Sequence, residues 1–553
     1  MEEAAQIVLN RRESFFIEEP KSTMSFDYII VGAGSAGCVL ADRLSADGRH
    51  RVLLLEAGGQ DRHPLIHMPK GMAKLFDDPN HILFFETEAD GITPSEVWIR
   101  GKTLGGSSSV NGMIYFRGHP EDYNDWERMG LAGWGWTDIG PAFRAIEDHE
   151  VPGGDRGQGG PLKISFARNK TPLNEAFLKA GEQIGIPRVE DLNHAGQEGV
   201  GYPTWTVRDG RRQSAAEAFL KPARGRPNLE VWTGVNIDRV LFDGTRAAGV
   251  TGTRSGQPFE CSTEGEVILS AGGLSTPQIL ERSGIGSAER LAALGIPVIH
   301  DSPDVGENLF EHRLLMMQYD LLKPWSQNPS YLGLRAIFNG ARYFLSRSGP
   351  MAEGSYEVGG FVKTDPSLDR PDVEILFAPY SLNLTFEGRV EGDSLHSAHM
   401  FGYPLRSRSR GSIHIRSADP GQGAVIRPNY LSDPYDCEVT LAMFRMQRKW
   451  MRQPALEGII GRETLPGPGV ETDEQILDAF RTAGQAGLHA CGTTRMGADE
   501  RAVLDEKLRV RGTSNLRVVD GGIMPTMVSA NTNGPIMAIS WRAAELILKE
   551  RNR

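Results

Sequence analysis

His489 is the best placed of the thirteen histidines in the sequence to accept a proton. It lies in Leu488–Gly497, LHACGTTRMG, a glycine-containing loop that precedes a predicted strand. An imidazole with its ordinary pKa near ~6.5 can act as a general base around neutral pH. We expect His312, in ENLFEH, to be structural or interdomain. His194, in DLNH, is expected to lie on a loop, and an approach to substrate is the alternative for it.

A glycine-rich turn near the N-terminus has the spacing of a dinucleotide-binding site. Residues 26–31 form a short apolar run, GAGSAG follows at 32–37, and helical periodicity continues from Cys38 to Leu44. Gly32 permits the tight turn, Gly34 lets the backbone approach a pyrophosphate, and Gly37 allows close packing of helix and strand. A second apolar run, 51–55, ends at Glu56, where a carboxylate can accept hydrogen bonds from the hydroxyls of an adenosine ribose.

Further segments place small residues at the ends of predicted strands. Residues 101–118 read GKTLGGSSSVNGMIYFRG, a flexible loop with many donors that is suited to lying against a phosphate or a cofactor ring. The other segments are EVILSAGG at 266–273, the proline-started helix TPQILERSGIG at 276–286, and NLRVVDGG at 515–522.

Length and composition limit the number of domains that position these residues and the classes of partner. A chain of 553 residues exceeds one core of ~250–300 residues, so we expect two domains. The 65 glycines, about 12% against ~7% on average, are typical of a chain that wraps a large cofactor. The net charge of −11 argues against nucleic acid and anionic membrane surfaces as partners.

The sequence also bears on location. No apolar run approaches the ~18–20 residues of a membrane helix, so no integral membrane segment is expected. Four scattered cysteines without a CxxC pair are typical of a reduced, cytoplasmic protein. Residues 1–23 lack the features of a secretory signal and are predicted to be a peripheral extension.

The ordered set of blocks resembles the glucose–methanol–choline (GMC) oxidoreductases, in particular their choline-dehydrogenase-like branch. The resemblance rests on these motifs: the fingerprint at 32–37, GKTLGGSSSVNG, SAGGLSTPQILERSGIG, VGENLFEH at 305–312, LHACGTTRMG, and RVVDGGIMP with SANTNGP. This resemblance implies an FAD-dependent alcohol oxidoreductase of α/β class, with a discontinuous Rossmann-like FAD-binding domain and an α+β substrate lobe built on an antiparallel sheet. The expected FAD-binding segments are 24–155, 208–315 and 476–553, and the substrate-binding segments are 156–207 and 316–475.

The resemblance also implies roles for individual residues. His489 would be the base opposite flavin N5, and Asn533 would bind the substrate oxygen and orient the alcohol. Glu56 would bind the adenosine ribose, Asn111 and Gly112 would lie near the flavin ring, Val235 near adenine, and Asp520 near the pyrophosphate and ribityl chain. The remaining cofactor contacts would come from Gly32, Gly34, Ser35, Ala36, Gly37, Ala57, Gly105, Gly106, Ser107, Ala271, Gly521, Asn531 and Thr532. Val110 stands where relatives with covalent flavin carry a histidine, so FAD is expected to be noncovalent.

The substrate is expected to be a primary alcohol, aryl or otherwise hydrophobic, that is oxidised to the aldehyde. Choline is the first alternative, although Leu488 replaces an aromatic residue often found before the catalytic histidine; Glu357 and Trp205 are the candidates for contacting its cation. The electron acceptor is O₂, a quinone or another acceptor. A flavin-dependent lyase or photodecarboxylase on the same scaffold is the alternative of another class. No zinc spacing and no GxSxG elbow is present, so neither a metal site nor hydrolase chemistry is expected.

Overall fold

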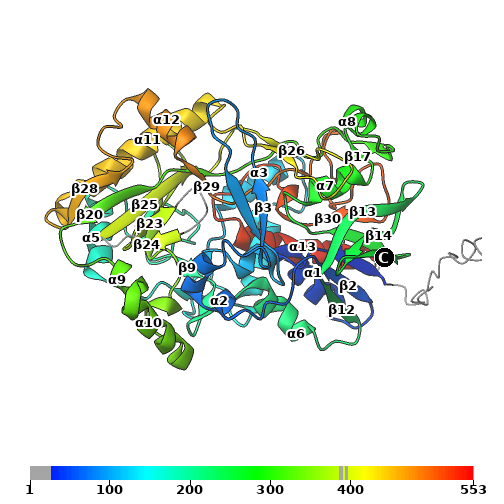
Figure 1. Ribbon diagram of the computed structural model, residues 1–553, viewed down its shortest axis with the longest axis horizontal. Helices are drawn as coiled ribbons and strands as arrows, with labels where there is room; N and C mark the ends of the chain where they lie inside the picture. Colours follow the sequence, from blue (N-terminus) through cyan, green and yellow to red (C-terminus); the bar gives the residue numbers. More distant parts are fainter. Residues whose placement is uncertain (1–25, 385–389, 393–395, 552–553) are drawn as a thin grey trace, which may run out of the picture.

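The computed structural model of the protein describes residues 26–384, 390–392 and 396–551. The predicted extension, residues 1–23, lies outside this part of the chain. Figure 1 shows two lobes side by side, one around a parallel sheet and the other around an antiparallel sheet. Within the described residues, no helix is both long and apolar enough to cross a membrane.

The parallel sheet joins strands from three distant parts of the chain. Its order is β12 (Leu229–Thr233), β2 (Val52–Glu56), β1 (Tyr28–Val31), β16 (Glu266–Leu269) and β30 (Leu516–Val518), and every neighbouring pair is parallel. All residues of β1 and β2 are buried, which explains their unbroken apolar sequences. Helix α1 (Ser35–Ser45) follows β1 and packs against α13 (Asn533–Arg551), the last helix of the chain.

The second lobe is built on a six-stranded antiparallel sheet. Its order is β28 (Ile460–Leu465), β20 (Met317–Leu321), β25 (Ser397–Pro404), β22 (Val373–Ala378), β21 (Val358–Val362) and β8 (Gly199–Gly201). Helices α5 (Pro172–Gln183) and α11 (Pro434–Met451) contact this sheet. Phe177 joins them to it, because its ring stacks on both Phe377 and Trp450, with centroids 4.3 and 4.8 Å apart.

Smaller elements connect and cover the two sheets. The hairpin of β3 (Ile82–Glu86) and β4 (Val97–Gly101) lies in the middle of the view in Figure 1. The other helices are α2 (Pro64–His67), α3 (Pro120–Arg128), α4 (Trp136–Ile146), α6 (Lys221–Ala223), α7 (Thr276–Arg282), α8 (Ala288–Ala293), α9 (Asn328–Tyr331), α10 (Gly333–Ser346) and α12 (Asp473–Thr482). The other strands include β5 (Ile114–Tyr115), β6 (Glu147–His149), β7 (Leu162–Phe166), β9 (Thr204–Trp205), β13 (Val235–Asp243), β14 (Arg246–Arg254), β15 (Gln257–Ser262), β26 (Ser412–His414) and β27 (Val425–Arg427).

The predicted fold class, a Rossmann-like parallel sheet with a second lobe on an antiparallel sheet, is confirmed. The strands of the parallel sheet all come from the segments predicted to bind FAD, and those of the antiparallel sheet from the predicted substrate-binding segments. The domain boundaries themselves stay a prediction.

Candidate active site

A cavity of about 2000 Å³ is lined by residues of both lobes. Its floor is the carboxyl edge of the parallel sheet, where Val31 and Glu56 end β1 and β2, and Ser270 and Asp520 follow β16 and β30. In open parallel sheets this edge is the usual place for a nucleotide. Its opposite wall carries Phe401 and Tyr403 of β25 in the antiparallel sheet.

Most of the predicted cofactor contacts line this one cavity. They are Gly32, Gly34, Ser35, Ala36, Glu56, Ala57, Gly106, Ser107, Asn111, Gly112, Val235, Ala271, Asp520, Gly521, Asn531 and Thr532. Gly37 and Gly105 are not among the lining residues. A Cβ on Gly37 would lie 1.8 Å from the carbonyl oxygen of Gly32, so this glycine serves helix–strand packing; Gly105 has a φ of +87° that a larger residue rarely adopts.

Backbone N–H groups hold the carboxylate of Glu56 in place without a bound ligand. Its two carboxylate oxygens accept the backbone N–H groups of Ala33, at 2.9 Å, and Gly58, at 2.8 Å. Burial raises the pKa of Glu56 to about 7, although these two hydrogen bonds oppose the shift. The side chain therefore reaches the cavity in a fixed orientation, with acceptor capacity left for the hydroxyls of a ribose.

The serine-rich loop 105–112 is a rigid support for the cavity. Ser108 and Ser109 use their hydroxyls to bind the carbonyl oxygens of Gly105 and Leu104, at 2.5 and 2.7 Å. Arg212, fully buried, donates to the carbonyl and side-chain oxygens of Asn111, at 2.8 and 2.7 Å. The sequence analysis did not single out Arg212, because the stretch GRRQS at 210–214 carries no signal of this contact.

Asp520 connects two separate segments at the sheet edge. It accepts the N–H groups of Gly272, at 2.9 Å, and Gly522, at 2.7 Å, and the hydroxyl of Thr276, at 2.6 Å. Burial raises its pKa, and these three donors act in the opposite direction. This carboxylate therefore fixes the turns after β16 and β30 beside the cavity.

The residues present fit a flavin adenine dinucleotide. A Cβ placed on Gly34 would meet nothing within 4 Å, and no side chain caps the N-terminus of α1, so its N–H groups face open space. Ser270 Oγ and Asn533 Nδ2 are buried, line the cavity and have no hydrogen-bond partner among the described residues. Buried polar atoms of this kind need a partner, and a bound dinucleotide would supply one.

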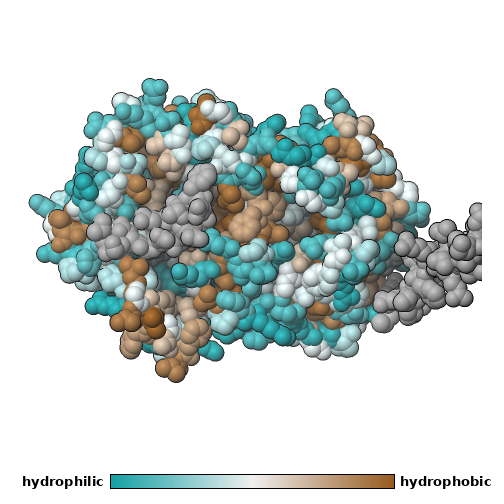
Figure 2. Space-filling view, viewed as in Figure 1, coloured by the Kyte–Doolittle hydropathy of each residue, from teal (hydrophilic) through white to brown (hydrophobic). Residues whose placement is uncertain are grey.

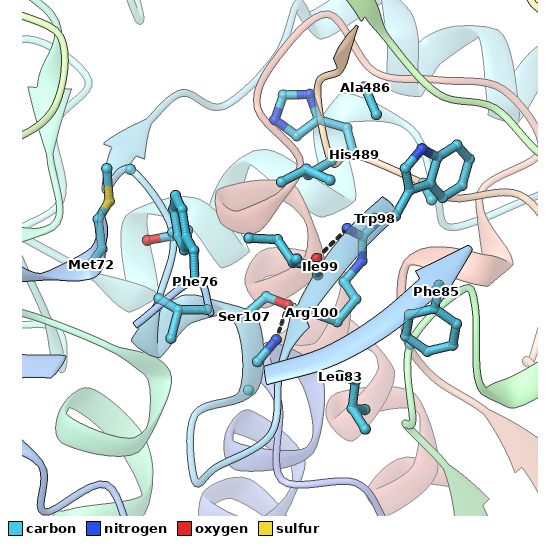
Figure 3. A pocket seen from close by; sticks show the side chains of 18 of the residues that line it. Met72, Phe76, Leu83, Phe85, Trp98, Ile99, Arg100, Ser107, Ala486 and His489 are labelled. Carbon is cyan, nitrogen blue, oxygen red and sulfur yellow. Dashed lines mark hydrogen bonds between the residues drawn. The ribbon is translucent and has the colours of Figure 1, made fainter. Parts of the chain in front are cut away.

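His489 lies at the end of the cavity away from the α1 fingerprint, above Trp98, Ile99 and Arg100 of β4 (Figure 3). Its backbone N–H donates to Glu311 Oε1 at 2.7 Å, and the preceding Leu488 has a φ of +63°, which turns the chain toward the cavity. Burial, together with nearby His312 and Arg100, holds the pKa of His489 well below its ordinary 6.5. The imidazole is therefore neutral at neutral pH and able to accept a proton.

The contacts of His312 determine which ring nitrogen of His489 carries the hydrogen and which carries the lone pair. His312 Nε2 lies 3.2 Å from the carbonyl oxygen of Leu405, which can only accept, so Nε2 carries the hydrogen. Burial lowers the pKa of His312 to about 4, so this ring is neutral and its Nδ1 is an acceptor. His489 Nδ1 lies 2.8 Å from that atom and must donate to it. The lone pair of His489 is therefore on Nε2.

The asparagine beside this lone pair is Asn531, whereas the sequence led us to expect Asn533 as the partner of His489. Asn531 Nδ2 lies 3.2 Å from His489 Nε2 and 3.1 Å from the hydroxyl of Tyr403. Asn533 instead accepts the hydroxyl of Ser35 at 2.7 Å and begins α13. Residues 531 and 533 point to different groups because the helix that starts at Asn533 fixes its side chain toward α1.

Other predicted contacts lie away from the cavity. His194 is exposed on a loop and is engaged by its own segment, at Glu198 and Gly196. Trp205 and Glu357, the candidates for a cation site, are buried but do not line the cavity, and Glu357 is held by Asn174. No group of three or more His, Cys, Asp or Glu side chains among the described residues is arranged to hold a metal ion.

The sequence interpretation also missed two neighbours of His489, namely His312 and Glu311; we call the part of the cavity around His489, His312, Asn531 and Tyr403 its catalytic end. His312 was expected to be structural, yet its ring contacts His489 and stacks on Tyr403 with centroids 4.2 Å apart. Glu311 accepts both His489 N–H and His312 N–H, and burial raises its pKa to about 7. Both residues belong to the motif VGENLFEH. Their place in this motif was the sequence signal that could have indicated a position near the site.

Comparison with known proteins agrees with this arrangement. Two family models described as GMC oxidoreductase match residues 26–314 and 407–540. The chain belongs to the GMC oxidoreductase family. It is therefore a flavin-dependent oxidoreductase that acts on CH–OH groups.

Individual relatives cover nearly the whole chain. An alcohol dehydrogenase [acceptor] of Pseudomonas putida is 41% identical over 540 residues, 95% of this chain and 96% of its own. Human mitochondrial choline dehydrogenase is 40% identical over 541 residues, 95% of this chain and 90% of its own. Among solved structures, pyridoxine 4-oxidase from Mesorbium loti superposes with a TM-score of 0.85 at 32% identity, covering 96% of this chain and 99% of that one.

Proposed function

We propose that this GMC oxidoreductase oxidises a primary alcohol with an apolar body to the aldehyde, with His489 as the base and Asn531 as the residue that binds the alcohol oxygen. This assignment of roles rests on one contact. His489 Nε2 and Asn531 Nδ2 lie 3.2 Å apart, and both residues line the cavity. A hydroxyl group placed beside both atoms, within hydrogen-bond distance of each, would donate its proton to the imidazole and accept a hydrogen bond from the amide.

FAD, when bound in this cavity, supplies the acceptor for the hydride that leaves the carbinol carbon. Glu56 would hold its ribose, the α1 N-terminus and Asp520 its pyrophosphate region, and Asn111 with Gly112 its ring. Val110 supports noncovalent attachment, because this side chain packs in a small cluster with Ile66, Leu75 and Ile82 and has no group that could form a bond to the flavin.

The protein prepares His489 for proton acceptance in two ways. Burial lowers its pKa, so no proton has to leave Nε2 before substrate binds. The Leu405 carbonyl and His312 together fix the tautomer that places the lone pair on Nε2. Arg100 adds positive charge near the substrate oxygen, which favours the alkoxide as the hydroxyl proton departs.

The lining of the catalytic end favours an apolar substrate. Phe85, Trp98 and Ile99 surround the space below His489 (Figure 3). Two acids lie in this part of the wall: Glu96 is paired with Arg313 at 2.8 Å, and the exposed Glu86 accepts the hydroxyl of Ser95 at 3.2 Å. Because Arg100 also faces the cavity beside His489, a quaternary ammonium bound there would meet a cation.

Choline remains the second candidate, because aromatic side chains such as Trp98 and Phe401 line the cavity and can surround a cation. The test is anaerobic mixing of the FAD-loaded protein with choline, a benzylic alcohol and a long aliphatic alcohol while the flavin absorbance is recorded. We expect the apolar alcohols to bleach the flavin faster than choline. Bleaching by choline alone would reverse the substrate assignment, and bleaching by no alcohol would favour a lyase or photodecarboxylase.

Admission of air to the reduced protein identifies the electron acceptor. Rapid recovery of the absorbance favours O₂, whereas recovery only after a quinone is added favours a dehydrogenase. We also propose a cytoplasmic location, which the four free cysteines support. Fractionation of cells into periplasmic and cytoplasmic contents tests it.

A further inference from the structure

Helix α10 exposes large apolar side chains that a protein surface rarely leaves uncovered. Leu334 is 84% exposed and Leu345 is 88% exposed, and Ile337, Phe338 and Phe344 are each more than half exposed. Figure 2 shows this cluster as a brown patch at the lower edge of the molecule, where Figure 1 places α10. Contiguous exposed apolar side chains mark an interaction surface.

The apolar side chains all lie on one side of the helix. At 3.6 residues per turn, Leu334, Ile337, Phe338, Phe344 and Leu345 fall within an arc of roughly 120°. The opposite side faces the protein, where Tyr343 is buried and donates its hydroxyl to the carbonyl oxygen of His67 at 3.0 Å. The helix is therefore anchored by one face and presents the other outward.

The charge around this face differs in sign from that of the chain. Residues 321–352 contain Lys323, Arg335, Arg342 and Arg347 and no aspartate or glutamate, a local charge of +4 in a chain of −11. Arg335 and Arg342 are exposed and flank one edge of the apolar arc. An apolar face bordered by arginines is typical of a helix that lies in the surface of a membrane containing anionic lipids.

We propose that α10 docks this protein onto the surface of an anionic phospholipid bilayer. The apolar arc enters the boundary between headgroups and acyl chains, while the arginines contact lipid phosphates. This is attachment to one leaflet and not a membrane span. Charge selects this partner over a second copy of the chain, because two copies would bring identical clusters of arginines together.

Docking would place the membrane beside the catalytic cavity. Ala336, Gly340 and Phe344 of α10 line the cavity that contains His489 at its other side. An apolar compound dissolved in the lipid would then have a short path to the cavity past α10. The docking itself is independent of which alcohol the protein oxidises.

The test is flotation of the FAD-loaded protein with lipid vesicles. We expect the protein to float with vesicles of phosphatidylcholine mixed with phosphatidylglycerol. With phosphatidylcholine alone, or at high salt, the floating fraction should be much smaller, because the arginine contacts are screened or missing. A wild-type protein that stays at the bottom of the gradient with the mixed vesicles would overturn the proposal.

Two variants assign the binding to α10. Phe338→Asp/Leu345→Asp should reduce flotation by about tenfold or more, because each change puts a carboxylate where the acyl region would be. Arg335→Glu/Arg342→Glu should remove the preference for anionic lipid. Ile92→Asp is the matched control, since Ile92 is 61% exposed on another surface, and it should float like the wild type.

Circular dichroism and flavin content establish that each variant is folded. If folded Phe338→Asp/Leu345→Asp floats as well as the wild type, another surface binds the lipid and the proposal is wrong. If the wild type is a dimer without vesicles and this variant is a monomer, the apolar arc is an interface between copies and the proposal is equally wrong.

Discussion

The two ends of the cavity are built by different kinds of contact. At the cofactor end, Glu56 and Asp520 bind backbone N–H groups of glycine turns, close to the strands that carry them. At the catalytic end, His489, His312, Asn531 and Tyr403 contact one another through their side chains, although they come from four separate segments.

This difference separates binding from chemistry. Substitutions at the cofactor end change a contact to the dinucleotide and should alter FAD affinity. Substitutions at the catalytic end leave the sheet edge and its glycine turns intact, so they should alter the rate of reduction while FAD stays bound. The predictions below test this division, from the largest expected effect to the smallest.

His489→Ala should slow anaerobic flavin reduction by about 10²–10⁴, the usual contribution of a positioned acid–base group, without loss of FAD. Stopped-flow absorbance under nitrogen measures the rate, with the alcohol identified in the screen. His194→Ala is the control, because this histidine lies outside the cavity. Reduction of His489→Ala at the wild-type rate would assign the base to another group.

Asn531→Ala should slow the same step by about 10², because it removes the amide that orients the alcohol oxygen. Asn533→Ala should have the smaller effect on rate and the larger effect on FAD retention, since Asn533 contacts Ser35 at the start of α1. Rates and flavin content are measured on both purified variants. The reverse pattern would restore the original assignment of Asn533.

Glu56→Gln should weaken FAD by ~1–3 kcal/mol, the scale of a charge-assisted hydrogen bond to a ribose hydroxyl. The wild-type affinity should rise between about pH 6 and about pH 8. The sign follows because the pKa of Glu56 is raised to about 7 and ribose hydroxyls bind its ionised form. Fluorescence titration of the apoprotein at several pH values measures both effects, and an identical pH dependence in Glu56→Gln would remove the carboxylate from the site.

His312→Ala should slow reduction about tenfold, because the Nδ1–H of His489 loses its acceptor and the tautomer is no longer fixed. Water admitted beside His489 should bring its pKa up toward the ordinary value, so the variant's rate should fall as the pH is lowered to about 6. The wild-type rate should stay constant over that range. A pH profile unchanged by the substitution would mean that His312 only fills space; His312→Asn, which retains an acceptor, should recover part of the rate.

Val110→Ala should leave flavin content and reduction rate nearly unchanged, because this side chain offers FAD only apolar contact. Acid precipitation should release the flavin of both proteins into the supernatant. Flavin that stays with the wild-type pellet would demonstrate a covalent link and contradict the expected noncovalent attachment.

Much of the cofactor end could be predicted from short stretches of sequence. The glycine spacing at 32–37, the apolar strands on either side and Glu56 at the end of the second strand are local features, and strand pairing in parallel brings their ends to one edge. The catalytic end was harder to predict, because His312 and His489 are 177 positions apart in separate segments of the chain, and Tyr403 reaches them from the antiparallel sheet.

The sequence by itself determined the parallel sheet with its glycine-rich turn, the acid at the end of β2 and the histidine we propose as base, since each depends on spacing within a strand, turn or loop. Only the tertiary structure decided that Asn531 rather than Asn533 faces His489, because the direction of a side chain two residues away depends on where α13 begins. The same holds for α10. The net charge of −11 argued against anionic membranes as partners. A net charge, however, does not say where on the surface the charges lie, and the folded chain exposes an apolar face bordered by arginines on one helix.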